Sequence, residues 1–144
     1  MFRDMILAVL LAAAAQPPAE APIVAEARAF MDGYARDLIA GDRAAIAGRY
    51  ERRGAWRLGE GGGEFDSYAR IVAGYAGPRW TAPRRFEWQD LRYRRAGTDA
   101  VQVTGRFAWT PADGRPRPFS YSALLVREED ALRIRLEDER PLGR

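Results

Sequence analysis

The sequence predicts an α+β domain in which three N-terminal helices pack on a strongly curved, mainly antiparallel sheet. Two observations predict it. Before Pro83, most apolar side chains recur at the spacing of a helix, whereas after Pro83 they recur at every second residue, the spacing of a strand. Because the helices come first and the long strands follow, the order fits an α+β domain better than an alternating α/β domain.

Three segments carry the signals of helices. The first, residues 22–40, has one apolar stripe, begins with a proline suited to a first turn and stops at a glycine. Asp42 then caps a second, short helix that extends to about Glu51. A third helix follows a cap at Asp66 or Ser67 and ends at the next Gly-Pro pair. Each helix needs a partner surface for its apolar side.

The strand signals are of two kinds. Residues 55–58 form a short strand, and the glycine-rich stretch 59–63 after it is interpreted as a hairpin tip, because no Gly-Lys-Ser/Thr follows to make a phosphate loop. The second half predicts a meander of four long antiparallel strands. Its apolar parity shifts by one near Gln89 and Asp90, which predicts a β-bulge there. The predicted long strands are residues 84–95, 100–110, 117–128 and 131–139.

The N-terminus has the pattern of a signal peptide. Residues 1–15 combine a short polar tip, an apolar run and a small-residue end, and the run is too short to span a bilayer, which takes about 20 apolar residues. Residues 16–21 are predicted to be an extended tether and residues 22–140 a single domain. The protein is therefore expected to be exported, periplasmic or secreted, with no membrane span after cleavage; an uncleaved anchor is the alternative.

Composition excludes several chemistries. The chain has no Cys and no His, and all 23 of its basic residues are Arg. Disulfides, thiolate nucleophiles, histidine relays and lysine Schiff bases are therefore excluded, and no cofactor or metal ion is expected. Any catalysis would depend on carboxylates, tyrosine and arginine. The net charge is only +3 and acidic residues lie among the arginines, so nucleic-acid binding is not predicted.

The order of these elements resembles the nuclear transport factor 2-like superfamily, which includes ketosteroid isomerases and SnoaL-like polyketide cyclases. The best local match is Tyr34-Ala-Arg-Asp-Leu-Ile-Ala-Gly41-Asp42, which is similar to the end of the family's first helix. The resemblance covers nearly all of residues 22–140 and implies a cystatin-like cone with an apolar cavity at its wide end. Helical stripe and strand parity give the candidate ligand-binding residues of that cavity: Tyr34, Tyr50, Trp56, Tyr75, Trp88, Phe107 and Tyr121.

The resemblance supplies only part of an isomerase site. Tyr34 matches the tyrosine that stabilises the enolate oxygen in the isomerases, but residues 55–59 hold no carboxylate where their base lies. The strand 117–128 likewise offers no second acid. No catalytic residue is therefore assigned, and the sequence favours a protein that binds a small apolar molecule without catalysis. An isomerase-, cyclase- or epoxide hydrolase-like enzyme using Tyr34 and a carboxylate still to be located is the alternative.

Two further interpretations concern surfaces. The resemblance implies a homodimer formed through the sheet, and Arg106, Arg133 and Arg135 could border that contact; a dimerisation or interaction module is thus a third hypothesis. The dense acidic run at residues 137–139 is interpreted as a solvated strand end and not as a calcium site, because neighbouring side chains of a strand alternate between faces and cannot converge on one ion. Asp90 and Arg92 share a strand face and are interpreted as a structural ion pair.

Overall fold

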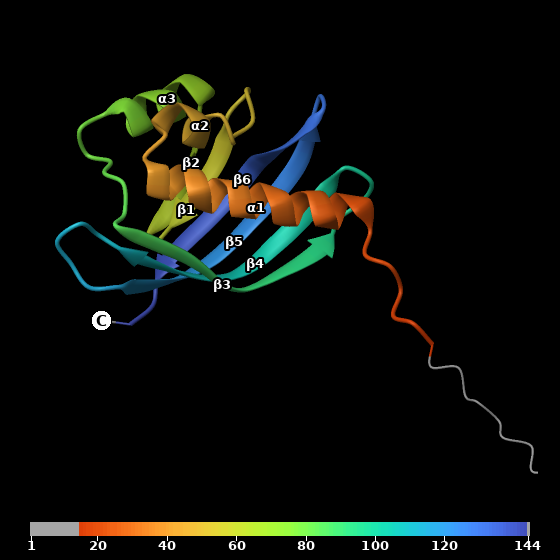
Figure 1. The fold of residues 1–144 in the computed structure, drawn as a ribbon. Helices are drawn as coiled ribbons and strands as arrows, with labels where there is room; N and C mark the ends of the chain where they lie inside the picture. The colour runs from red at the N-terminus through yellow and green to blue at the C-terminus, as the bar shows by residue number, and fades with distance from the viewer. Residues whose placement is uncertain (1–14, 144) are drawn as a thin grey trace, which may run out of the picture.

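The computed structural model describes residues 15–143, so the predicted signal peptide lies almost entirely outside the described residues. Within them the chain forms three helices and one sheet of six strands (Figure 1). The elements are α1 (Pro22–Ala40), α2 (Arg43–Ala47), β1 (Ala55–Gly59), β2 (Gly62–Asp66), α3 (Tyr68–Ala76), β3 (Arg85–Arg95), β4 (Ala100–Thr110), β5 (Arg117–Glu128) and β6 (Ala131–Pro141).

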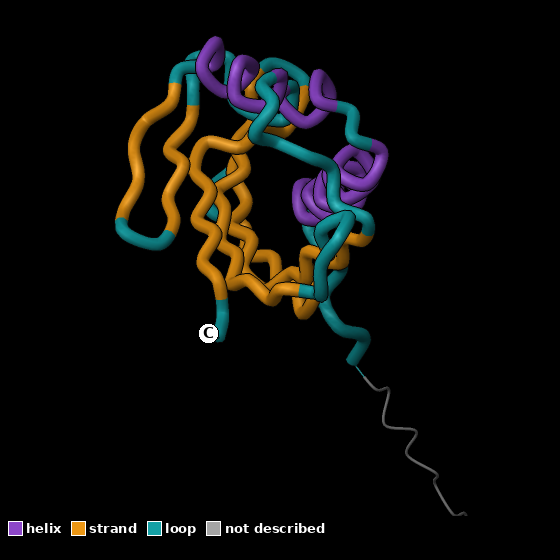
Figure 2. Tube along the Cα trace, turned by 90° about the vertical axis from the view of Figure 1, so that its left-hand side faces the viewer, coloured by secondary structure: helices purple, strands orange, loops and turns teal. Residues whose placement is uncertain are grey.

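The predicted α+β class is confirmed. The strand order is β2-β1-β6-β5-β4-β3, and every neighbouring pair is antiparallel except β1 and β6, which run parallel. Figure 2 shows the strands curving around one side while the helices lie on the other. The long helix α1 crosses the concave side of the sheet, and α2 and α3 lie together near its end (Figure 1). This arrangement is the cone that the sequence predicts.

The junction between α1 and α2 follows the predicted signals. Gly41 ends α1 with φ 68°, a left-handed conformation that suits glycine, and the Asp42 side chain accepts a hydrogen bond of 3.0 Å from the Ala45 N–H. The second helix is shorter than predicted and ends at Ala47. The reason is tertiary: the chain then turns and joins β6, where the Glu51 N–H donates to the Ile134 carbonyl at 3.1 Å.

The glycine-rich stretch forms more strand than predicted. Only Glu60 and Gly61 make the tip of the hairpin, and β2 was not predicted because its glycines carry no strand signal. Gly63 is required by the pairing, since a Cβ there would lie 2.4 Å from the Arg57 carbonyl oxygen. Hydrogen bonds to β1 thus make a strand of residues whose own preferences do not favour one.

The predicted β-bulge is confirmed between Gln89 and Arg92. Asp90 has a positive φ of 53°, and its carboxylate pairs with the exposed Arg106 on β4. The proposed pairing of Asp90 with Arg92 is therefore wrong, because the bulge turns Asp90 toward the neighbouring strand. Gly105 faces the bulge, where a Cβ would lie 2.8 Å from the Leu91 side chain.

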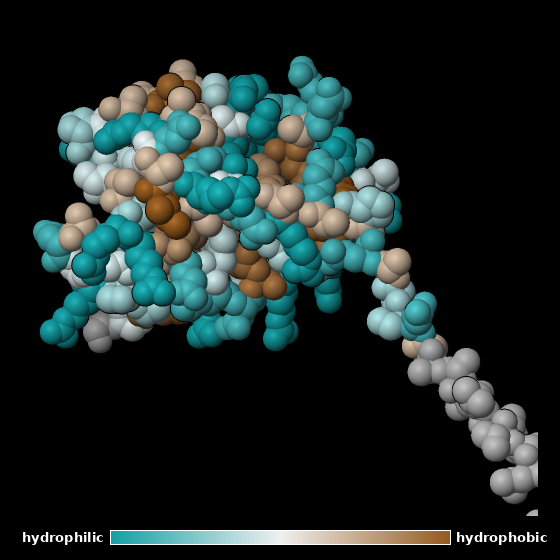
Figure 3. Space-filling view, viewed as in Figure 1, coloured by the Kyte–Doolittle hydropathy of each residue, from teal (hydrophilic) through white to brown (hydrophobic). Residues whose placement is uncertain are grey.

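The hydrophobic core lies between α1 and the concave face of the sheet. Its largest fully buried side chains include Tyr34, Tyr50, Met31, Ile71 and Ile134. On the face shown in Figure 3, hydrophobic residues form small, separate patches among hydrophilic ones. Among residues 15–143, no helix is both long enough and apolar enough to cross a membrane.

Candidate functional site

A cavity of about 300 Å³ opens at one end of the core. Its wall is mostly aromatic and comes from both layers of the fold: helices α1 and α3, the segment that follows α3, and strands β1, β3, β4, β5 and β6. Ring-to-ring contacts hold this wall in shape; Trp88, for example, lies 5.6 Å from Phe107 between ring centres. The lining residues are Tyr34, Leu38, Arg57, Tyr75, Trp80, Phe86, Trp88, Phe107, Trp109, Pro111, Arg117, Phe119 and Glu139.

The structure places the seven predicted ligand-binding residues in three groups. Four of them line the cavity: Tyr34, Tyr75, Trp88 and Phe107. Two more, Tyr50 and Tyr121, are buried beside the cavity without lining it. Trp56 lies on the opposite face of the sheet, where 48% of its surface is exposed. The parity chosen for β1 was off by one residue, since its neighbour Arg57 faces the cavity instead.

The buried tyrosines converge on Glu137, a carboxyl group that is only 3% exposed. The hydroxyls of Tyr50 and Tyr121 donate to it at 2.8 Å and 2.9 Å, and the Tyr34 hydroxyl lies 3.3 Å from its Oε2. A carboxylate only accepts hydrogen bonds, whereas a carboxylic acid must also place its own proton. Three donors around one carboxyl group therefore suit its ionised form.

The tyrosine hydroxyls also bond to one another and connect the cluster to the cavity. The Tyr50 oxygen lies 3.1 Å from that of Tyr34 and 3.0 Å from that of Tyr75, and both of these partners line the cavity. Burial raises the pKa of Tyr34, Tyr50 and Tyr121 well above its usual value and that of Tyr75 to about 12, and the charge of Glu137 adds to the shift. All four phenols are thus neutral donors at physiological pH.

Glu139 brings a second carboxyl group to the cavity wall itself. It lies two residues after Glu137 on β6, so both side chains point to the concave face. Burial raises the pKa of Glu139 well above its usual range, and the neighbouring charge of Glu137 raises it further, while Arg57 opposes the shift. The interpretation of residues 137–139 as a solvated strand end is therefore wrong for two of its three members.

Parity alone could not have found this pair. Counting in twos from buried Leu132 and Ile134 leads to Leu136 and Asp138, but the register of β5 and β6 shifts by one residue between the pairs Leu125–Ile134 and Leu124–Leu136, which brings Glu137 and Glu139 to the buried side. Without that shift the acids fall on the solvent face. The missing carboxylates are thus on β6, whereas the resemblance directs attention to β1 and β5.

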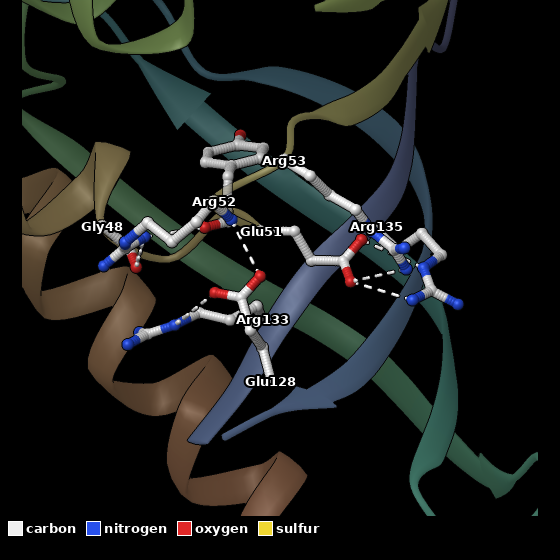
Figure 4. A network of polar contacts seen from close by, with 8 residues as sticks. Gly48, Glu51, Arg52, Arg53, Glu128, Arg133 and Arg135 are labelled. Carbon is white, nitrogen blue, oxygen red and sulfur yellow. Dashed lines mark hydrogen bonds and ion pairs between the residues drawn. The ribbon is translucent and has the colours of Figure 1, made fainter. Parts of the chain in front are cut away.

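A second buried carboxylate lies outside the cavity, at the turn between α2 and β1. The Glu51 side chain receives bonds of 3.0 Å and 2.9 Å from Arg135, and Arg53 lies 3.4 Å away (Figure 4). Next to it, the Arg52 N–H donates to Glu128 at 2.9 Å. These contacts attach the turn to β6 and account for Glu51 as a structural group.

The described residues give no indication of a metal centre: no three His, Cys, Asp or Glu side chains between residues 15 and 143 are grouped to hold an ion. What the cavity does offer is an apolar wall, neutral hydroxyl donors, one carboxyl group with a raised pKa and two guanidinium groups, Arg57 and Arg117. Such a set can bind an apolar molecule with polar substituents, and it can move a proton.

No family model and no curated protein matches the sequence. The structure is similar to a nuclear transport factor 2-like protein of unknown function from Shewanella oneidensis, with a TM-score of 0.71 at 12% identity over 81% of this chain and 97% of that one.

Two other solved structures are similar to the same degree. A putative ketosteroid isomerase from Parabacteroides distasonis gives a TM-score of 0.67 at 10% identity, covering 81% of this chain and 86% of that one. A putative calcium/calmodulin-dependent protein kinase II association domain from Xanthomonas campestris gives 0.68 at 17% identity, covering 90% and 94%. These identities bear on the fold and not on activity. The chain therefore has the nuclear transport factor 2-like fold that its sequence resembles.

Proposed function

We propose that the protein binds a small, largely apolar molecule in the cavity between α1 and the sheet. The observation that carries the proposal is the cavity itself, whose volume of about 300 Å³ is at the lower end of the range of small-molecule sites. Its aromatic wall supplies apolar contact area, and the polar groups at its edges would orient the ligand. The core side chains leave this space open.

Calorimetric titration with naphthylmethanol, an uncharged bicyclic probe, tests this proposal. We expect the wild-type protein to bind the probe and Leu38→Phe to weaken binding by about tenfold or more, because the larger ring projects into the cavity that Leu38 lines. Ile39→Phe is the matched control, since residue 39 is 49% exposed and does not line the cavity. Absence of binding by the wild type, or equal binding by the two variants, would refute the proposal.

An enzyme that transfers protons is the second candidate, favoured by the position of Glu139. A carboxyl group with a raised pKa holds a proton at higher pH and is a stronger base once ionised. Ionised Glu139 could take a proton from a carbon next to a ligand carbonyl, while the electron pair of the broken C–H bond moves toward the carbonyl oxygen. The Tyr34 hydroxyl on the cavity wall would turn its proton from Glu137 to that oxygen, while Tyr50 and Tyr121 continue to donate to Glu137.

Exchange of the α-protons of β-tetralone in D₂O, followed by NMR, tests the enzyme candidate. We expect wild-type protein to accelerate exchange and Glu139→Gln to lower the protein-dependent rate by about a hundredfold, the lower part of the range for acid–base catalysis. Trp56→Phe, altered on the outer face, should keep the rate. Protein that binds the ketone yet leaves exchange at its background rate would exclude this reaction class.

We also propose that the protein is exported and pairs with a second copy of itself through the outer face of the sheet. An apolar row crosses that face on four adjacent strands, from Phe65 and Trp56 to Leu136 and Leu124, which lie opposite one another in register. Phe65 and Trp56 are each about half exposed. Apolar side chains gathered in this way are typical of contact surfaces between subunits.

A further inference from the structure

We propose that the ligand of the cavity is an organic acid: a compact apolar ring system with one carboxylate or similar anionic group, which pairs with Arg117 at the rim. This inference rests on the proposed function, because it assigns a chemical class to the ligand of the same cavity. It is carried by the charges around the cavity and by which of them already have a partner.

The first charged group, Arg57, is balanced within the protein. Its Cα lies opposite that of Glu137 in the parallel pairing of β1 and β6, and both side chains belong to the concave face. Arg57 also lies over the rings of Tyr50 and Tyr75, at 5.6 Å and 5.4 Å from their centres. Its guanidinium group also forms an ion pair of 3.8 Å with Asp66. The carboxylates and the rings together account for one positive charge, so Arg57 alone gives no reason to expect an anion.

Arg117 differs from Arg57 in that its charge is not balanced within the described residues. It begins β5, is exposed and lines the cavity, and within residues 15–143 it has neither an ion pair nor a hydrogen bond from its guanidinium group. Arg106 and Arg135 on the same sheet, by contrast, are paired with Asp90 and Glu51. The rim of the cavity therefore carries a guanidinium group whose five N–H donors are available to a ligand.

The surroundings of the rim add to its positive charge. A smaller hollow of about 240 Å³ shares Arg57, Tyr75 and Trp80 with the cavity and adds Arg79, another exposed arginine without an ion pair among the described residues. Arg57 and Arg117 thus line the cavity, and Arg79 lines the hollow beside it. A low-dielectric wall weakens the screening of such charges, so a ligand anion is attracted and a cation is repelled.

The one acid on the wall does not cancel this effect. Burial and the neighbouring charge of Glu137 raise the pKa of Glu139, so this carboxyl group stays neutral over a wider range of pH than an exposed glutamate. A neutral carboxyl group does not repel a carboxylate. Arginine is also the side chain best suited to hold a carboxylate, because its planar fork matches the two oxygens.

A pair of probes with the same ring system tests the inference: naphthoate, which carries a carboxylate, and naphthylmethanol, which does not. At pH 7 and low salt we expect the wild-type protein to bind naphthoate about tenfold more tightly, as measured by calorimetry. Arg117→Gln should remove most of that preference, because it should weaken naphthoate binding far more than naphthylmethanol binding. Arg115→Gln is the matched control, because it removes the same charge from an exposed residue nearby that does not line the cavity.

The outcomes separate the two proposals. If both probes bind equally well, or the alcohol binds better, the inference of an acidic ligand is wrong and the proposed function stands. If neither probe binds, the proposed function itself is wrong. If Arg117→Gln and Arg115→Gln lower naphthoate binding to the same extent, the preference reflects overall charge, and the assignment of Arg117 as its partner is overturned.

Discussion

Glu137 and Glu139 give the concave face of the sheet two carboxyl groups that differ in their partners. Glu137 is enclosed by hydroxyl donors, which stabilise its negative charge, whereas Glu139 borders an aromatic wall beside that charge. Two close carboxyl groups cannot both ionise without mutual repulsion, so the second one holds its proton more tightly. The environment thus gives two chemically identical side chains different partners and raises the pKa of Glu139.

The raised pKa of Glu139 predicts how stability depends on pH. Since the folded state holds this proton more tightly than the unfolded state, where the carboxyl group titrates near its usual value of 4.5, its contribution to stability is fully present below that pH. It is lost as pH rises through the raised value in the folded protein. The groups that face it are Glu137 and Asp138 on its own strand, Arg57 on β1, and tyrosines that stay neutral throughout.

Urea unfolding of wild type and Glu139→Gln at a series of pH values measures this contribution. The variant keeps the shape of the side chain but cannot titrate. We expect the free energy of unfolding of wild type, relative to the variant, to fall as pH rises from about 4.5, at up to about 1.4 kcal/mol per pH unit. A difference that stays constant or increases with pH would contradict the assignment of the acid.

At the scale of elements, the sequence predicts those whose signals lie within one segment and misses those that depend on pairing with another segment. The bounds of α1, β4 and β5 agree with those predicted, because a helix stripe with a proline start and a glycine stop, or a strict alternation, is written within the segment itself. The strand β2 and the early end of α2 were not predicted. Both depend on bonds to another segment: β2 on its hairpin partner β1, and the end of α2 on Ile134 of β6, far along the chain.

Two glycines in helical surroundings are expected to respond to alanine with opposite signs. Gly41 has φ 68°, so Gly41→Ala should lower the free energy of unfolding by about 1 kcal/mol, the cost of placing a Cβ in the left-handed region. Gly74 lies inside α3, and a methyl group there would meet no other atom within 4 Å, so Gly74→Ala should raise stability by about 0.5–1 kcal/mol. Thermal or urea unfolding of both variants checks the pair; a shared sign would contradict it.

At the scale of the whole molecule, the two faces of the sheet have different roles. The concave face carries the core, the tyrosine cluster and the cavity, whereas the outer face carries the row of Phe65, Trp56, Leu136 and Leu124. Charged residues of both signs, such as Asp138, accompany the row on β6. A second copy related by a two-fold axis would cover the apolar row and could pair these charges with their opposites.

Light scattering after size-exclusion chromatography tests this pairing. We expect a dimer for wild type and a shift to monomer for Trp56→Arg, because a charge would be buried in the middle of the contact. Ile39→Arg is the matched control: Ile39 is 49% exposed, close to the 48% of Trp56, but lies on α1 away from the sheet's outer face. A wild-type monomer at high concentration, or equal effects of both variants, would refute the dimer.

The sequence by itself determined the fold class, most element bounds, the bulge at Asp90 and four of the cavity residues, because periodicity and capping act over short stretches of chain. Only the tertiary structure decided where the polar groups of the site come from. Glu139 on β6 and Arg117 on β5 reach the cavity through the register of the sheet, and a shift of one residue moves a side chain to the other face. The sequence pattern of one strand cannot determine that register, because the register depends on partner strands elsewhere in the chain.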